Sequence, residues 1–259
     1  MLVFFLCLIV ITGCGRNEQQ KGITVAGSTS VQPFADKWAE VYMEEHSDRV
    51  VNVQGGGSSA GIQAAKSGAA NIGTSSRELK ADEKDLNEII AARDGLAVIV
   101  HPSNQVNNLS MVQLKGIFAG TILNWKEVNG VDRPITVVTR EEGSGTRGAF
   151  QELVMGKTRI CKWAIVQDSN GAVREIISGD PHAMGYISLG LVNDKVKALK
   201  LDDVIATDEN IITKRYKLVR PFLFVTKGQP TGQVKNFITF VLSREGQSLV
   251  EKEGLIPAK

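Results

Sequence analysis

Three short loops rich in glycine, serine and threonine carry the chemistry that stands out in this sequence. Residues 27–30 read GSTS, residues 55–59 read GGGSS, and residues 143–146 read GSGT. Each loop follows an apolar run and precedes the pattern of an amphipathic helix, so each places backbone N–H groups and hydroxyls at a predicted helix N-terminus. A cation, Arg140, lies three residues before the last loop. Together these features predict a pocket for a small, desolvated oxyanion.

Other chemistries fit the same residues less well. Ser144 lies in a Gly-Ser-Gly turn, which is shorter than the Gly-x-Ser-x-Gly elbow of serine hydrolases. Residues 55–61 lack the Gly-Lys-Ser/Thr ending of a nucleotide-binding P-loop. The histidines are scattered and no residues have the spacing of metal ligands, so we expect neither a metal nor a cofactor.

The first 21 residues differ in composition from the rest of the chain. Residues 2–12 are uncharged and apolar, with the length of a signal-peptide core and too few residues to span a bilayer. Residues 11–14 read ITGC, which resembles the lipobox of bacterial lipoproteins, whose cysteine becomes the lipidated first residue. We therefore expect a lipoprotein signal peptide at 1–13, lipidation of Cys14 and a tether at 14–21. A plain secretory signal with an incidental cysteine is the alternative.

Charge and cysteine usage exclude several classes of partner and bond. The chain has 30 basic and 28 acidic residues, a net charge of +2, and no run of lysine or arginine, so we expect no nucleic-acid partner. Once Cys14 carries lipid and the signal peptide is removed, Cys161 is the one thiol left. The mature protein then has no intrachain disulfide.

Predicted strands and helices alternate from residue 23 onward, which indicates an α/β fold with largely parallel sheets. The predicted strands are residues 23–26, 50–53, 70–73, 96–100, 135–139, 184–188 and 222–225. Helices are predicted after each of the three loops and at residues 82–92, 111–118 and 170–177. The clearest helical periodicity lies at residues 234–242.

Two proline-marked breaks divide this pattern, at His101–Pro102 and at Arg220–Pro221. We interpret them as crossings of the chain between two lobes. Lobe one is then residues 22–100 plus 220–259, and lobe two is residues 101–219. Two of the loops would lie in lobe one and the third in lobe two, which places the ligand in the cleft at the carboxyl ends of the strands.

A series of short motifs, taken in order, resembles the PstS phosphate-binding proteins of bacterial ABC importers. The motifs are AGSTSVQP at 26–33, GSSAG at 57–61, NIGTSSR at 71–77, NWKEV at 124–128, REEGSGT at 140–146 and GYIS at 185–188. The resemblance implies a two-lobed, type II periplasmic-binding-protein-like fold. It also implies a non-enzymatic monomer, held at the outer face of the cell membrane by its lipid, that passes inorganic phosphate to ABC permease subunits.

The family's anion ligands fall on eight positions of this chain when they are carried over by motif. They are Thr29, Ser30, Ser58, Ser76, Arg140, Ser144, Gly145 and Thr146. One branch of the family has an aspartate at the position of Ser76, and its carboxylate accepts the proton of the bound phosphate and helps to reject sulfate. Because this chain has a serine there, a binder of sulfate or molybdate stays open as an alternative, as does an enzyme that acts on phosphate esters.

Four further residues receive roles from the same comparison and from their neighbours. In the family an acidic residue is salt-linked to the ligand arginine, and we expect Glu142 to take that place beside Arg140. We expect Arg77 to form a structural salt bridge. Trp125 and Trp163 are interpreted as packing anchors.

Overall fold

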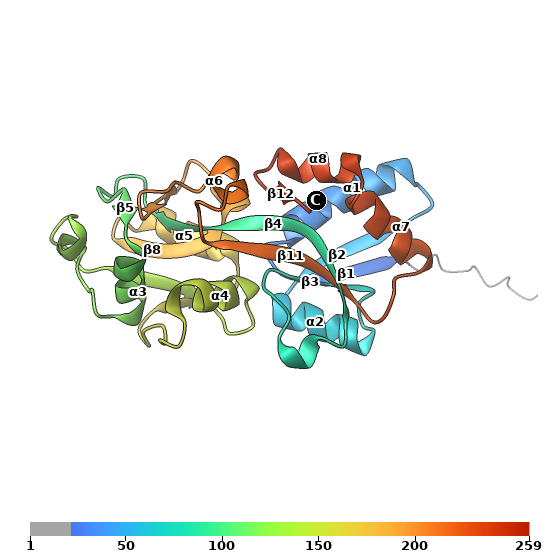
Figure 1. Ribbon diagram of the computed structural model, residues 1–259, viewed down its shortest axis with the longest axis horizontal. Coiled ribbons are helices and arrows are strands. Elements are labelled where there is room, and N and C mark those ends of the chain that lie inside the picture. The colour runs from blue at the N-terminus through green and yellow to red at the C-terminus, as the bar shows by residue number, and fades with distance from the viewer. Residues whose placement is uncertain (1–21, 259) are drawn as a thin grey trace, which may run out of the picture.

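The computed structural model describes residues 22–258, which form two lobes joined by two long strands (Figure 1). The predicted signal peptide, Cys14 and the tether lie outside the described residues. Strand order across the main sheet is β2-β1-β3-β11-β4-β8-β6-β7. The joining strands are β4 (Asn87–Val100) and β11 (Val219–Thr226), and both run through the middle of the molecule.

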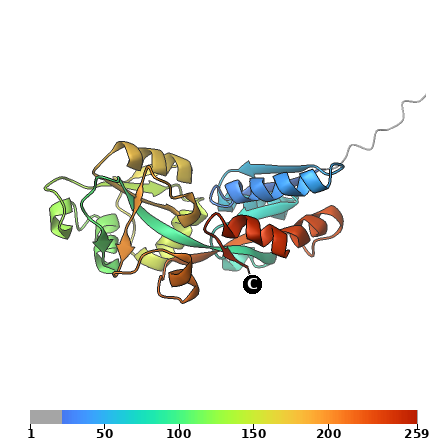
Figure 2. The same ribbon diagram turned by 90° about the horizontal axis from the view of Figure 1, so that it is seen from above.

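Lobe one contains the first three strands and helices from both ends of the chain. Its elements are β1 (Ile23–Gly27), α1 (Gln32–Glu45), β2 (Val51–Gly55), α2 (Ser58–Ser67), β3 (Ile72–Ser75), the 3-10 turn η1 (Ala81–Glu83), α7 (Gly232–Val241), α8 (Arg244–Glu251) and β12 (Ile256–Pro257). β1 pairs in parallel with both β2 and β3. Figure 2 shows α1 beside the C-terminal helices, and the Trp38 indole donates to the Gly246 carbonyl at 2.6 Å.

Lobe two holds the middle of the chain. Its elements are β5 (Asn108–Leu109), α3 (Met111–Ala119), η2 (Trp125–Val128), β6 (Thr136–Arg140), α4 (Gly145–Phe150), the π-helical turn η3 (Gln151–Met155), β7 (Ile165–Gln167), α5 (Asn170–Gly179), β8 (Ala183–Ser188), η4 (Leu189–Leu191), β9 (Lys197–Ala198), β10 (Lys200–Leu201) and α6 (Asp208–Ile212). β6 pairs in parallel with β7 and β8. Phe150 and Tyr186 stack at 4.0 Å in its core.

Strand pairing places the first crossing between the lobes inside β4. The part of β4 up to Gly95 pairs with β11, whereas Leu96–Val100 pairs with β8. We expected lobe one to extend to residue 100, so the first boundary lies earlier than the break at His101 suggested. A proline after a strand marks the end of that strand, and the chain had already changed lobes within it. From here on, lobe one is residues 22–95 and 219–258, and lobe two is residues 96–218.

Two expectations about secondary structure need correction. Residues 82–92 form η1 and the start of β4 instead of a helix, because Ile89 and Ile90 belong to a central strand whose apolar run a helix could equally show. The sheet is mixed: β1 is parallel to β2 and β3, and β6 is parallel to β7 and β8, but β11 is antiparallel to β3 and β4, and β4 is antiparallel to β8.

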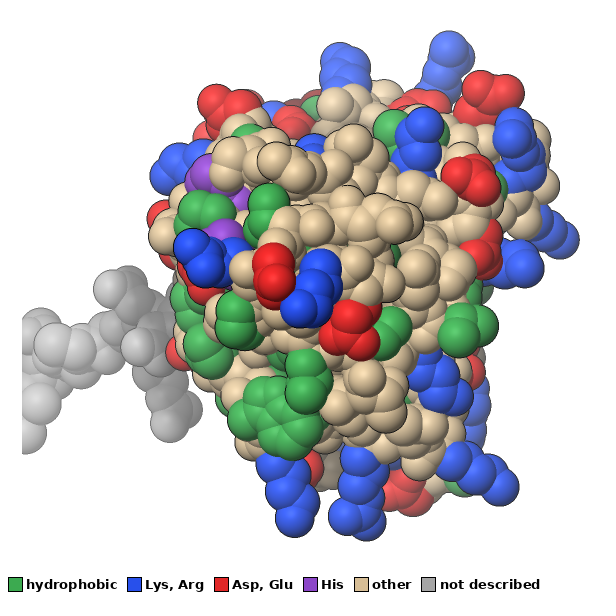
Figure 3. Space-filling view, turned by 90° about the vertical axis from the view of Figure 1, so that its left-hand side faces the viewer, with side chains coloured by type: hydrophobic (Ala, Val, Ile, Leu, Met, Phe, Trp, Pro, Cys, Tyr) green, Lys and Arg blue, Asp and Glu red, His purple; other side chains and the backbone are tan. Residues whose placement is uncertain are grey.

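The two tryptophans singled out in the sequence differ in burial. Trp125 is fully buried, and its indole donates to the His182 carbonyl at 2.9 Å, as a packing anchor should. Trp163 is 62% exposed, so the expectation that it anchors the core is wrong. Figure 3 looks onto the outer end of lobe two, where acidic and basic side chains are interspersed over the surface. Within residues 22–258, no helix is long and apolar enough to cross a bilayer.

Candidate anion-binding site

The carboxyl ends of six strands meet where the two lobes face each other. β1, β2 and β3 lead into the loops of lobe one, and β6, β7 and β8 lead into those of lobe two. Seven of the eight predicted ligand residues are buried here, and the eighth, Thr29, is half-buried. The crevice at the carboxyl ends of the strands is where open α/β sheets place their ligands.

Arg140 is the buried cation of the site, with 1% of its surface exposed. It ends β6, and its guanidinium is fixed from two directions by backbone of the same lobe. Nε donates to the Gln167 carbonyl at 3.2 Å, and Nη2 donates to the Asp168 carbonyl at 2.9 Å. Nη2 also reaches across to lobe one, where it donates to Thr29 Oγ1 at 3.2 Å.

The third nitrogen of this guanidinium has no partner. Arg140 Nη1 is buried and makes no hydrogen bond within the described residues. An unpaired buried donor on a cation costs free energy, and native proteins rarely leave one without a function. Because its other nitrogens are already fixed by β7 and the residue after it, Nη1 is an unpaired donor held in a fixed position.

Glu141, and not Glu142, neutralises this cation. Both Glu141 carboxylate oxygens accept from Arg140, from Nε and Nη2, at 3.0 Å each. Glu142 is 92% exposed in its side chain and lies 4.0 Å from Arg147. The expectation for Glu142 was therefore wrong, because the turn after β6 points the first of the two glutamates back along the arginine. The bidentate pair leaves the arginine end of the site near neutral overall.

Hydroxyls from both lobes meet across the cleft. Ser30 Oγ and Thr146 Oγ1 are 2.8 Å apart, and the Ser59 amide donates to the Gly143 carbonyl at 3.1 Å. Since these bonds join opposite lobes, the structure shows the lobes closed on each other. Ligand entry therefore requires a hinge opening about β4 and β11.

A second group of hydroxyls lies on the lobe-one side. Ser28 Oγ donates to Ser76 Oγ at 2.9 Å, Ser58 Oγ lies 3.5 Å from Ser76 Oγ, and the Ser76 amide donates to Ser58 Oγ at 3.1 Å. Ser58 is the first residue of α2, so the positive end of that helix faces the same place. Ser28 belongs to this group and was missed, although it stands inside the GSTS loop.

Gly145 is required where the lobes touch. A Cβ on this residue would lie 2.6 Å from Ser76 Oγ and would also collide with Ser58. Ser144, just before it, uses its hydroxyl oxygen to cap α4 by accepting from the Arg147 amide at 3.2 Å. The GSGT loop therefore combines a helix cap with a close approach that no larger residue permits.

Besides Ser28, sequence reasoning missed Asn170 and Arg220, which complete the site. Asn170, the first residue of α5, donates from Nδ2 to Ser30 Oγ at 2.9 Å and to Thr29 Oγ1 at 3.2 Å. Arg220 of β11 donates to Ser30 Oγ at 3.1 Å, and it forms a buried ion pair with Asp94 of β4 at 2.8 Å. The one available signal was position: Asn170 heads a predicted helix, and Arg220 precedes the second proline break.

Burial shifts the pKa of both members of the Asp94–Arg220 ion pair at the hinge. Loss of solvent raises the pKa of Asp94 and lowers the pKa of Arg220, and the attraction of each for its partner opposes the change. Ser188 Oγ adds a hydrogen bond to Asp94 at 2.9 Å. The pair stands where both joining strands cross between the lobes, so it links the hinge to the ligand loops.

Arg77 has the structural role that we expected. Its guanidinium donates to Glu83 at 2.7 Å and 2.9 Å, with both side chains buried. The hydrogen bond from Arg77 is the main reason why the pKa of Glu83 lies below its ordinary value. Arg77 also donates to Ser59 Oγ at 3.3 Å and lies close to Gly148 of lobe two, so the pair holds the segment after β3 against the edge of the cleft.

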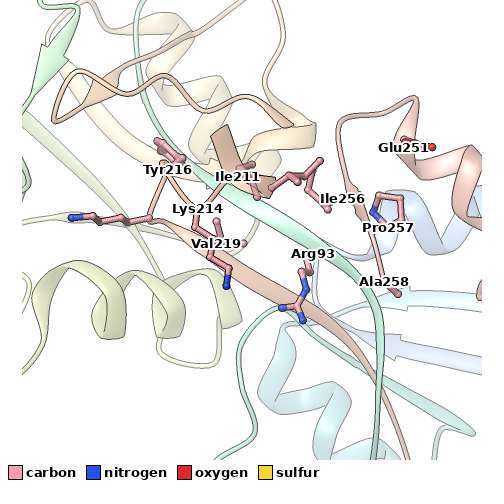
Figure 4. A pocket seen from close by; sticks show the side chains of 11 residues that line it. Arg93, Ile211, Lys214, Tyr216, Val219, Glu251, Ile256, Pro257 and Ala258 are labelled. Atoms are coloured by element: carbon pink, nitrogen blue, oxygen red, sulfur yellow. The ribbon is translucent and has the colours of Figure 1, made fainter. Parts of the chain in front are cut away.

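A groove of about 910 Å³ lies behind the hinge (Figure 4). Arg93 and Val219 line it, whereas their neighbours Asp94 and Arg220 face the ligand loops. Successive residues of a strand point to opposite faces, so the groove and the hydroxyl cluster lie on opposite faces of the same two strands. None of the predicted ligand residues lines the groove.

The described residues offer no centre for a metal. Between residues 22 and 258, no three His, Cys, Asp or Glu side chains come together in a way that could hold one. Cys161 is buried with a free thiol, and burial raises its pKa. The donor set of the cleft is instead two guanidinium groups, several hydroxyls, an amide and helix N-termini, which suits a small oxyanion.

Comparisons with known proteins point the same way. Residues 14–245 match the PBP superfamily domain. The phosphate-binding protein PstS of Bacillus subtilis is 36% identical over 251 residues, which cover 94% of this chain and 83% of that protein. PstS of Borreliella burgdorferi is 30% identical over 273 residues, covering 100% of this chain and 98% of that protein.

Solved structures agree with these relatives. A substrate-binding protein from Clostridium perfringens, crystallised with bound phosphate, superposes with a TM-score of 0.90 at 45% identity, covering 92% of this chain and 100% of that chain. A phosphate transport receptor from Vibrio cholerae superposes with a TM-score of 0.76 at 40% identity, covering 90% of this chain and 99% of that chain. The chain therefore belongs to the PstS family of phosphate-binding proteins, within the PBP superfamily.

Proposed function

We propose that this protein binds inorganic phosphate in the cleft between its lobes and delivers it to an ABC importer. The observation that carries the proposal is the buried, unpartnered Nη1 of Arg140, whose neighbouring Nη2 reaches the hydroxyl of Thr29 in the opposite lobe. Phosphate fills this need because its oxygens accept several hydrogen bonds at once. Membership of the PstS family and the phosphate held by the Clostridium perfringens relative support it.

Recognition by such a site rests on oriented dipoles and hydrogen bonds more than on net charge. Arg140 is matched by Glu141, and Arg220 is matched by Asp94. The two pairs leave the charged side chains of the site balanced, so the anion is held by directed donors and by the N-terminus of α2. Binding without turnover is supported by the relatives, which are described as phosphate-binding proteins.

Calorimetric titration of the purified protein with phosphate, sulfate and arsenate tests the proposal. We expect saturable binding of one phosphate per chain, competition by arsenate, and weaker competition by sulfate. Because Ser76 can donate as well as accept, phosphate affinity should change little as the pH is raised. Sulfate binding tighter than phosphate binding would make the protein a sulfate binder, and turnover of a chromogenic phosphate ester would make it a hydrolase.

We propose further that Cys14 is lipidated and holds the protein at the outer face of the membrane. The support is the apolar segment at 2–12 followed by ITGC, and two acyl chains anchor a protein stably where one does so only marginally. The polar residues that follow Cys14 would then act as the tether that lets the lobes reach a permease. Mass spectrometry of the protein extracted from membranes tests this assignment by the mass added at Cys14.

A further inference from the structure

Hydrogen bonds within the closed site restrict which way its hydroxyl protons can point. A serine or threonine hydroxyl has one proton to donate and two lone pairs that accept. Ser30 Oγ accepts from Asn170 Nδ2 at 2.9 Å and from Arg220 Nη2 at 3.1 Å. With both lone pairs occupied, the proton of Ser30 can only be donated, to Thr146 or to a bound anion.

Thr29 is restricted in the same way. Its Oγ1 accepts from Asn170 Nδ2 and from Arg140 Nη2, both at 3.2 Å. Its proton is therefore also left for donation into the cleft. One amide group thus acts on two hydroxyls, because the two N–H bonds of Asn170 Nδ2 are directed to Thr29 and Ser30.

The orientation of the Asn170 amide is itself fixed. Its oxygen Oδ1 accepts from the Ser188 backbone amide at 3.2 Å, so the nitrogen must face the hydroxyls. Asn170 is 1% exposed and heads α5 behind the Ser169 cap. Arg220 is fixed on its other side by Asp94, which accepts from Nε and Nη2 at 2.9 Å and 2.8 Å.

We propose that Asn170 and Arg220 are positioning residues that make Thr29 and Ser30 obligate donors to the anion. This inference rests on the proposed function, since it states which groups of the same site donate hydrogen bonds to the anion and which can accept one. The pocket is then asymmetric. The side formed by Thr29 and Ser30 can only donate. Ser76 accepts from Ser28 and lies 3.5 Å from Ser58 Oγ, a contact in which either hydroxyl can be the donor, so Ser76 can offer the anion either its proton or a lone pair. The proton of the bound phosphate therefore points toward Ser76 and away from Thr29 and Ser30.

Substitution of Asn170 by aspartate tests this directly, because it replaces the donating nitrogen by an accepting oxygen of the same shape. The bond from Ser188 to Oδ1 can remain. Thr29 and Ser30 would turn their protons to the new carboxylate and present lone pairs to the anion. The added negative charge would also repel the anion, so the two effects must be separated.

A double-mutant cycle separates them. Asn170→Asp is measured in the native protein and in a Thr29→Val/Ser30→Ala background, with phosphate affinity read by calorimetry. We expect Asn170→Asp to weaken binding by about 100-fold or more in the native protein and by about tenfold or less in the background without hydroxyls. Charge repulsion acts in both backgrounds, whereas reorientation of hydroxyls acts only where they are present.

Asn104→Asp is the matched control. Asn104 is another buried asparagine of lobe two, whose Nδ2 donates to the Pro181 carbonyl and whose Oδ1 accepts from the Val106 amide. It does not touch the cleft, so its substitution should leave phosphate affinity within roughly twofold. Thermal unfolding of each variant without phosphate checks folding. If Asn170→Asp does not fold, Asn170→Leu replaces it. We then expect phosphate affinity to fall about tenfold in the native protein and to change very little in the Thr29→Val/Ser30→Ala background.

The inference would be overturned if the Asn170 substitution weakened phosphate binding by the same factor in both backgrounds. That result would leave the proposed function standing as long as the native protein binds phosphate. Absence of phosphate binding to the native protein would instead overturn the proposed function itself. The Arg220 half of the proposal predicts that Arg220→Lys lowers the coupling between Asn170 and Ser30 in the same cycle, and an unchanged coupling would remove Arg220 from it.

Discussion

Replacement of Arg140 by alanine should weaken phosphate binding by about 3–5 kcal/mol, because it leaves a buried anion without its charge partner. The size follows from the geometry of the site. Two unit charges about 4 Å apart at an effective dielectric constant of about 20 interact by about 4 kcal/mol. Loss of the cation removes this attraction and the hydrogen bond from Nη1, and it leaves the Glu141 carboxylate unpaired beside the anion.

Calorimetry should then show a dissociation constant about 10² to 10⁴ times larger, since each 1.4 kcal/mol is a factor of ten. The double variant Arg140→Ala/Glu141→Gln should recover part of the loss, because it removes the unpaired carboxylate. Arg77→Ala is a control for the loss of a buried arginine that is paired with a carboxylate but is not a predicted ligand; it should lower stability and change phosphate affinity much less than Arg140→Ala does. A loss of less than about 1 kcal/mol for Arg140→Ala would refute the role given to this residue.

Four further changes have defined outcomes. Thr29→Ala should cost about 1–3 kcal/mol of binding by calorimetry, for one hydrogen bond to a charged group; a loss equal to that of Arg140→Ala would contradict the assigned roles. Gly145→Ala should block closure, so affinity falls while the melting temperature without ligand stays within a few degrees; unchanged affinity would mean that the cleft need not close. Cys14→Ala should release the protein from membranes or leave its signal uncleaved, and unchanged fractionation would exclude the lipid anchor. Glu83→Gln should lower the free energy of unfolding at neutral pH. Because the folded pKa of Glu83 lies below the ordinary 4.5, the difference should persist above that pH and vanish as the pH falls through the folded value; a difference that is independent of pH would argue against the ion pair.

Local sequence predicted the loops of the site because their chemistry is local. Gly145 and the hydroxyls around it stand in short motifs that follow strands and start helices, and those rules depend on a few neighbouring residues. The same reasoning singled out Arg140, which the structure buries between the lobes, and it predicted the structural role of Arg77. Its error over Glu142 was one of geometry, since the two adjacent glutamates differ only in how the turn after β6 directs them.

The rest of the site depends on contacts between distant segments. Asn170 reaches Ser30 across 140 positions of the chain, and Arg220 reaches it across 190. No local pattern distinguishes an asparagine at a helix start from one that fixes hydroxyls of the opposite lobe. The crossing inside β4 was hidden for a related reason. Nothing in the sequence of a continuous apolar strand indicates where its pairing changes from one neighbouring strand to another. The proline after β4 was therefore interpreted as the boundary between the lobes.

The position of the anion in a crystal structure of the phosphate complex tests the central claim most directly. We expect one phosphate between the lobes, with an oxygen within hydrogen-bond distance of Arg140 Nη1 and others held by Thr29, Ser30 and the GSGT loop. The Ser30–Thr146 contact should widen or rearrange to admit it. A phosphate bound instead in the groove lined by Arg93 and Lys214, with the cleft empty, would contradict the account.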